Sequence, residues 1–200
     1  MPGILIALFL VAGSVLAWVA WQAEKKRRAA FELWAGQNDF TYSRQNDPEV
    51  RARYGFLDRL QAGHSRRGYH VLHGAWSGRA AAAFQFRYVT GAGKNQQTHY
   101  VAVAVLHLEK SFPEFVLSPE NIFHRFGGLF GFDDIDFESV EFSQAFQVRS
   151  QDKKFAYDFC NTGMMEFLLQ HRDTCLEQEN GVLALFRDGA LKPDGLDGMF

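Results

Sequence analysis

An uncharged apolar run near the amino terminus constrains the fold more than any other feature of the sequence. Residues 4–21 read ILIALFLVAGSVLAWVAW and contain no Asp, Glu, Lys or Arg. At about 1.5 Å of rise per residue, a helix of this length spans roughly 27 Å, close to the thickness of a bilayer core. Trp18 and Trp21 lie at the end of the run, where aromatic residues mark a membrane interface. The run predicts a transmembrane anchor over residues 1–23.

A cleaved signal peptide is the main alternative for this segment. No Lys or Arg precedes the run, and the run is longer than the apolar part of a usual signal peptide. A small-residue cleavage site lies near Ala17, but Trp18 follows it and the polar region that normally precedes a cleavage site does not appear. A core helix of a soluble domain is also disfavoured, because the run is apolar on every face. The retained anchor is the favoured prediction.

Four cations follow the anchor, and they predict its orientation. The positive-inside rule places residues 24–200 in the cytoplasm, with the cluster against anionic lipid. The first 110 residues hold 14 Lys and Arg against 7 Asp and Glu, whereas the last 90 hold 7 against 16. Nucleic acid is not a predicted partner, because no basic helix or aromatic-basic repeat stands out. The predicted membrane-surface residues are Lys25, Lys26, Arg27 and Arg28.

The remaining chain has the length and composition of one globular domain. It is long enough to bury a core, and with 15% aromatic and 22% charged residues overall it is not of the disordered type. Cys160 and Cys175 do not form a C-x-x-C pair, which favours two packing thiols in a reducing compartment. A single disulfide in an exported domain stays open as the alternative.

Helix signals dominate the segment that follows the anchor. The first helix is predicted to continue to a C-cap at Gly36, and a short strand follows at residues 40–43. Asp47 and Pro48 form an N-cap and N1 pair, which predicts a second helix ending near Gly55. Residues 62–68, AGHSRRG, are predicted to form a loop.

The middle of the chain has the alternation and turn residues of a β region. Residues 98–109 are apolar on both faces, which predicts a central strand. The connections are short, so antiparallel hairpins are expected. The predicted strands are residues 69–76, 79–90, 98–109 and 115–118.

The last third is predicted to be mixed. Residues 119–131 and 141–146 are expected as helical turns, 135–139 as a short acidic strand or turn, 152–160 and 164–171 as helices, and 147–150 and 182–187 as strands. Residues 189–200 are rich in Gly and Pro and are predicted to be a loose tail. The sequence thus predicts an α+β fold: one N-terminal transmembrane helix followed by an antiparallel sheet of about five or six strands with helices packed against it. Its parts are an anchor (1–23), a juxtamembrane helix and first strand (24–46), a globular domain (47–188) and the tail.

No motif with a known chemistry passes a test of spacing. The loop before Lys94 lacks the first Gly and the final Ser or Thr of a P-loop, and it joins two strands instead of opening a helix. No H-E-x-x-H, EF-hand or G-x-S-x-G pattern occurs. The sequence therefore predicts no catalytic, cofactor-binding or metal-ligating residue. Convergence of histidines from different strands stays open.

Two polar segments are the predicted partner surface, and a third segment suggests a pocket. The Phe-rich stretch 112–146 is predicted to pack in the core, with a lipid pocket as the alternative. The partner surface comprises a strand-connecting loop and an acidic run: Thr90, Lys94, Asn95, Gln96, Gln97 and His99 in the first, and Asp133, Asp134, Asp136 and Glu138 in the second.

Several strings resemble a family of bacterial membrane-anchored proteins that has no assigned activity. They are residues 86–99 (FRYVTGAGKNQQTH), 134–139 (DIDFES) with Glu141 and Phe142, and the stretch from Lys154 to Phe167. The likeness covers most of residues 24–190. It implies a bacterial source and a membrane tether, and it supplies no substrate, cofactor or catalytic residue.

These features favour a membrane-tethered binding or scaffolding module at the inner face of the bacterial cytoplasmic membrane. Its expected partners are the lipid bilayer and membrane or membrane-associated proteins. A membrane-bound enzyme acting on lipid or envelope precursors is one alternative, and a lipid-binding domain is the other. No cofactor is predicted.

Overall fold

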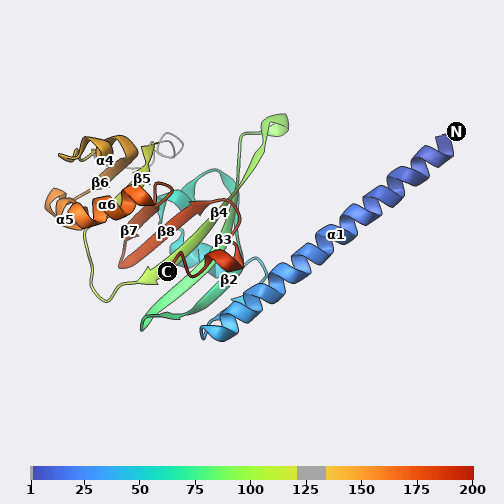
Figure 1. Ribbon diagram of the computed structural model, residues 1–200, viewed down its shortest axis with the longest axis horizontal. Helices are drawn as coiled ribbons and strands as arrows, with labels where there is room; N and C mark the ends of the chain where they lie inside the picture. The colour runs from blue at the N-terminus through green and yellow to red at the C-terminus, as the bar shows by residue number, and fades with distance from the viewer. Residues whose placement is uncertain (1, 121–133) are drawn as a thin grey trace.

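The computed structural model describes the backbone of residues 2–120 and 134–200, and side chains from residue 9 onward outside the same gap. Its centre is an eight-stranded antiparallel sheet in the order β1-β2-β3-β4-β8-β7-β5-β6 (Figure 1). The described residues therefore confirm the α+β prediction, with more strands than expected. The strands are β1 (Thr41–Ser43), β2 (His64–Trp76), β3 (Arg79–Thr90), β4 (Gln97–His107), β5 (Phe115–Pro119), β6 (Phe146–Ser150), β7 (Cys175–Glu179) and β8 (Val182–Asp188).

Helix α1 (Pro2–Gln37) is much longer than the other helices and has two distinct parts. Its amino-terminal part projects away from the domain (Figure 1), and large apolar side chains between Phe9 and Trp21 are exposed. Its carboxyl-terminal part docks on the sheet, where Phe31, Trp34 and Ala35 are buried. No helix meets the length and hydropathy needed to cross a membrane when the search is confined to the described residues.

One predicted helix begins and ends at the expected caps, whereas α1 continues through its predicted C-cap, Gly36, to Gln37. Helix α2 (Pro48–Tyr54) has Asp47 as N-cap and Gly55 as C-cap. Asn161, expected as part of a break, accepts a hydrogen bond from the Met164 amide and caps α6. The remaining helices of the described residues are α4 (Val140–Ala145), α5 (Lys153–Phe159), α6 (Thr162–Gln170), and the 3-10 turns η1 (Asp58–Gln61), η2 (Gly93–Asn95) and η3 (Pro193–Gly195). The turn predicted at residues 119–131 lies largely outside the described residues.

The loop predicted at residues 62–68 is wrong over most of its length, because β2 begins at His64. Irregular pairing hides this strand in the sequence. Its register with β3 shifts twice, and Ser65 and His70 have positive φ angles of 53° and 50°. Such bulges break the two-residue alternation from which a strand is recognised.

Strand β7 was not predicted at all. Its sequence, CLEQE, has polar residues at three of five positions, yet Glu177 and Gln178 are buried. The turn that joins β7 to β8 is Asn180-Gly181, with φ angles of 50° and 73°. Asn-Gly with two positive φ values is typical of a two-residue hairpin, so this turn was the available signal.

The two faces of the sheet carry separate cores. One face packs on α2 and η1 through residues such as Tyr54, Leu57 and Phe84. The other packs on α1 and on the chain after β8 through Phe31, Trp34 and Leu191. A third cluster joins β5 and β6 to α4, α5 and α6 and contains many of the Phe side chains from the Phe-rich stretch. Cys160 and Cys175 are free and buried, and burial raises the pKa of Cys160 to about 12.

The chain after β8 is packed, which differs from the loose tail that its Gly and Pro content predicts. Leu191 and Leu196 are fully buried, and Met199 is 8% exposed. Phe200 stacks on Trp76 at 5.1 Å between ring centroids and on Trp34 at 6.3 Å. The Trp34 indole N–H donates to Asp197. Burial of these apolar anchors outweighs the conformational freedom of the intervening glycines.

Candidate functional site

An apolar groove lies on the sheet face that carries α1. It encloses about 670 Å³ and is bounded by α6, by strands β4, β7 and β8, and by the chain end. Apolar side chains supply most of its wall. The lining residues are Ala104, Leu106, Phe159, Met164, Phe167, Leu168, His171, Thr174, Leu176, Leu183, Leu185, Arg187, Asp197, Gly198, Met199 and Phe200. We call this set the apolar groove.

The floor of the groove follows from strand alternation. On β8, Leu183, Leu185 and Arg187 point to the groove, while the residues between them point to the opposite core. On β4, Ala104 is paired with Leu185. Its small side chain leaves room above the sheet that a larger residue would fill.

Helix α6 supplies the facing wall. Met164, Phe167, Leu168 and His171 recur at the three- and four-residue spacing that places side chains on one helix face. The His171 ring stacks on Phe167 with 4.2 Å between ring centroids. Phe167 is 52% exposed, so the rim of the groove presents a large aromatic side chain to solvent.

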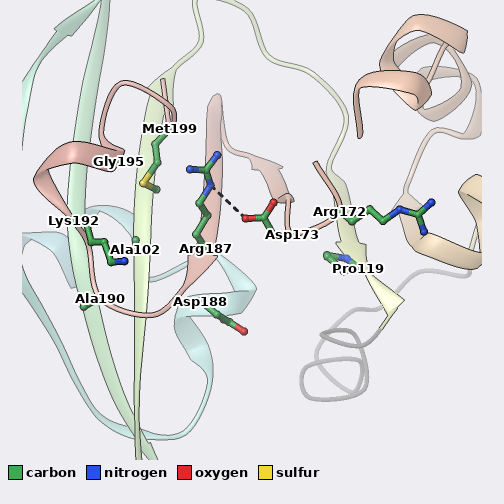
Figure 2. A pocket seen from close by; sticks show the side chains of 10 residues that line it. All are labelled: Ala102, Pro119, Arg172, Asp173, Arg187, Asp188, Ala190, Lys192, Gly195 and Met199. Carbon is green, nitrogen blue, oxygen red and sulfur yellow. Dashed lines mark ion pairs between the residues drawn. The ribbon is translucent and has the colours of Figure 1, made fainter. Parts of the chain in front are cut away.

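A second, polar cavity adjoins the groove and shares Arg187 and Met199 with it. It encloses about 640 Å³, and Figure 2 shows Arg187 and Asp173 facing each other across it, with their charged groups 3.9 Å apart. The Arg187 guanidinium also donates to the Gly198 carbonyl at 2.8 Å. We call this the polar cavity; its residues are Ala102, Pro119, Arg172, Asp173, Arg187, Asp188, Ala190, Lys192, Gly195 and Met199.

The two neighbouring cavities suit one class of ligand. Aliphatic and aromatic walls favour an acyl chain, because apolar surface removed from water stabilises binding by about 25 cal/mol per Å². Guanidinium, ammonium and carboxylate groups at the adjoining end favour a polar head that forms several hydrogen bonds. The arrangement therefore accommodates an amphiphile.

The two halves of the predicted partner surface are not brought together. The loop lies at the tip of the β3–β4 hairpin, where residues 91–97 are exposed. The acidic run lies beside β6, at the edge of the sheet, and three strands separate β6 from β4. Asp134 pairs with Arg149 at 2.6 Å, Asp136 and Glu138 are exposed, and Asp133 lies outside the described residues.

The predicted membrane-surface cluster divides into two pairs. Lys25 and Lys26 are exposed. Arg28 pairs with Glu24 at 3.2 Å. Arg27 turns to the domain, where it donates to the Gln85 side chain at 2.6 Å and to the Leu191 carbonyl at 2.7 Å. Arg27 thus fastens α1 to both the sheet and the tail.

Replacing Arg27 with methionine is expected to lower the free energy of unfolding by about 1–3 kcal/mol, because a charged donor is lost and the buried Gln85 amide is left unpaired. Urea unfolding of the full chain in detergent micelles measures the effect. Lys26→Met, an exposed cation on the same helix, is the matched control. Equal stability of the two variants would show that Arg27 does not fasten the helix.

The histidines that the structure describes do not converge. His70 contacts Tyr42 at 2.6 Å, and burial lowers its pKa to about 4. His107 contacts Tyr54, and His99 contacts Thr90. Within the part of the chain that the structure describes, no group of three or more His, Cys, Asp or Glu residues could hold a metal ion. Neither of the two cavities above is lined by His70, His99 or His107.

A buried polar cluster on the opposite face was missed by sequence reasoning. The Glu177 carboxylate accepts hydrogen bonds from the amides of Asp58 and Arg59 and so caps η1. Arg59 is 3% exposed and pairs with Asp188. Burial raises the pKa of Glu177 to about 8, against the opposing effect of the two backbone donors. The cluster connects η1 to β7 and β8, which is a structural role.

The fold and groove together define an α+β domain with a large antiparallel sheet and an amphiphile-sized cavity. No protein-family model matches the chain, and no curated protein matches it. A similar solved structure is that of the mycobacterial trehalose monomycolate transport factor A, TtfA. The two share a TM-score of 0.60 and 13% sequence identity, over 87% of this chain and 86% of that chain. At this identity the likeness shows the fold.

Proposed function

We propose that this chain is a membrane-tethered lipid-binding module, held at the membrane by α1 and receiving an acyl chain in the apolar groove. The observation that carries the proposal is the groove itself, because an apolar cavity on a sheet face lies there beside a polar cavity, and Arg187 lines both. The tether keeps the groove close to its ligand and so raises the effective concentration of lipid around it.

The exposed apolar part of α1 supports the tether. Phe9, Leu16 and Trp18 are each at least 60% exposed and touch no part of the domain core. Exposure of such an apolar surface to water is unfavourable, and burial in the apolar core of a bilayer removes that cost. The four cations that follow the run favour a cytoplasmic location for residues 24–200.

The structural neighbour supports a role with envelope lipids. Its name assigns it to transport of trehalose monomycolate, which is a glycolipid. A glycolipid has the apolar chain and polyhydroxyl head that the groove and polar cavity suit. We extend to this chain a lipid-related role, with a polar-headed amphiphile as the class of ligand.

The test is the lipid content of the full chain after mild extraction from native membranes, read by native mass spectrometry. We expect a lipid to co-purify with the natural sequence. Phe167→Glu places a charge at the groove rim and is expected to reduce bound lipid at least about tenfold, because burying a carboxylate beside an acyl chain is unfavourable.

Val140→Glu is the matched control, since Val140 is also an exposed apolar residue on a helix but does not line the groove. This variant should retain the lipid. Absence of a lipid from the natural sequence, or equal loss in both variants, would contradict the groove as its binding site.

A further inference from the structure

The end of the sheet that carries the β3–β4 hairpin tip is strongly basic. The start of β2 and the end of β3 are paired there, His64 with Val89 and Arg67 with Arg87. Segments 62–68 and 85–100 contain no Asp or Glu. We call the four cations of this end the basic tip: Arg66, Arg67, Arg87 and Lys94.

These cations are available for an external anion. Arg66 donates only to the carbonyls of Ala62 and Gly63, and Arg87 donates to the Thr98 hydroxyl at 3.4 Å. Within the described ranges, none of the four has an acidic partner. Arg67 and Lys94 are exposed. The positive charge is therefore not neutralised within the domain.

The contacts of α1 show that the helix runs toward this same end. Trp34 stacks on Trp76, beside the β2–β3 turn at the far end of the strands. One turn earlier, Phe31 stacks on His70, and Arg27 then reaches Gln85 on β3. The step from Trp34 to Phe31 therefore leads from the β2–β3 turn toward the hairpin tip, and the Arg27 contact lies level with that of Phe31, because Gln85 pairs with Tyr69. Figure 1 shows the tip and the apolar part of α1 leaving the domain on the same side.

Distances along the two elements indicate how far the tip reaches. From Arg27 to Trp21 the helix rises about 9 Å, whereas from Gln85 to Thr90 the strand extends about 17 Å. Because α1 and the hairpin point the same way, the strand extends about 8 Å past the level of Trp21, so the tip reaches the part of α1 that is apolar.

We infer that the basic tip rests on the anionic lipid headgroups of the membrane that holds α1. This contact rests on the tether part of the proposed function and goes beyond the groove. Lys and Arg near an anionic bilayer are attracted to its surface potential within about a Debye length. The hairpin, with α1, would then form a second support that fixes how the domain is oriented over the bilayer.

A fluorescent label at the tip tests the contact. Cys160 and Cys175 are buried, so Asn95→Cys provides a single reactive thiol at the tip, and Ser77→Cys provides one at the opposite end of the same hairpin strands. The labelled full chain is placed in nanodiscs of two compositions. One contains phosphatidylcholine alone, and the other also contains about 30% of the anionic lipid phosphatidylglycerol. A spin-labelled headgroup serves as the quencher.

We expect quenching at Asn95 to exceed that at Ser77 severalfold in the anionic discs, and to fall to the Ser77 level in Arg66→Gln/Arg67→Gln/Lys94→Gln. Equal quenching at the two sites overturns the inference. Quenching at Asn95 that is the same with and without phosphatidylglycerol also overturns it. A label at Ser14→Cys with a quencher in the acyl region separates the two proposals. If Ser14 is quenched and Asn95 is not, the tether holds and the tip contact fails; if Ser14 is not quenched, both fail.

Discussion

Replacing Leu196 with alanine is expected to lower the free energy of unfolding by about 3 kcal/mol, within the range for truncation of a buried leucine. Leu196 is fully buried among Leu191, Met199 and the residues of α1 that dock on the sheet. The cavity left by the substitution cannot be filled from β4, where Ala102 and Ala104 are small. Chemical denaturation of the full chain in detergent measures the loss.

Asp194→Ala is the control, because Asp194 is exposed in the same segment. A surface change of this kind is expected to alter stability by less than about 0.5 kcal/mol. Leu196→Ala is also expected to disturb the wall of the apolar groove, because Met199 and Phe200 line the groove. A loss below about 1 kcal/mol would mean that residues 191–200 are loosely attached, as their composition suggests.

Glu177 is expected to make stability fall as pH rises. Its pKa is about 8 in the folded protein against an ordinary value of 4.5, so the folded state favours the protonated form. The associated stabilisation is fully present below pH 4.5, declines as pH rises, and is lost above about pH 8. At about 1.4 kcal/mol per pKa unit, the unfolding free energy is expected to fall by about 3–5 kcal/mol across this pH range.

Glu177→Gln removes the titration and should flatten the profile of unfolding free energy between pH 4.5 and about 8, the window set by the ordinary and the folded-state pKa values. Glu166→Gln, at an exposed position on α6, should leave the profile unchanged. A natural protein whose stability is level across this window would show that the carboxylate is ionised in the folded state, held by the amides of Asp58 and Arg59.

Elements governed by local chemistry were predictable from the sequence. Asp47 and Pro48 begin a helix because a side-chain acceptor and a fixed φ are both local properties. Strands β3 and β4 alternate or are uniformly apolar, and they were placed within one or two residues. Each of these signals lies within a few residues of the structure it produces.

Elements governed by distant contacts were not predictable. Strand β7 buries Glu177 because its carboxylate accepts from amides more than 110 residues away in the chain. The tail is ordered by Trp34 and Arg27, which lie on the first helix. The groove likewise joins α6, β4, β8 and the chain end. Its only local traces are the alternation in β8 and the helical stripe through Phe167.

Photolabelling shows directly whether the groove receives an acyl chain. The full chain is placed in nanodiscs whose phospholipid bears a diazirine in one acyl chain, and the labelled peptides are mapped after irradiation. We predict labels on α1 and also on residues 164–176 and 183–187, with the latter two lost in Phe167→Glu. Labels confined to α1 would show that α1 is in the membrane and that the groove does not bind lipid.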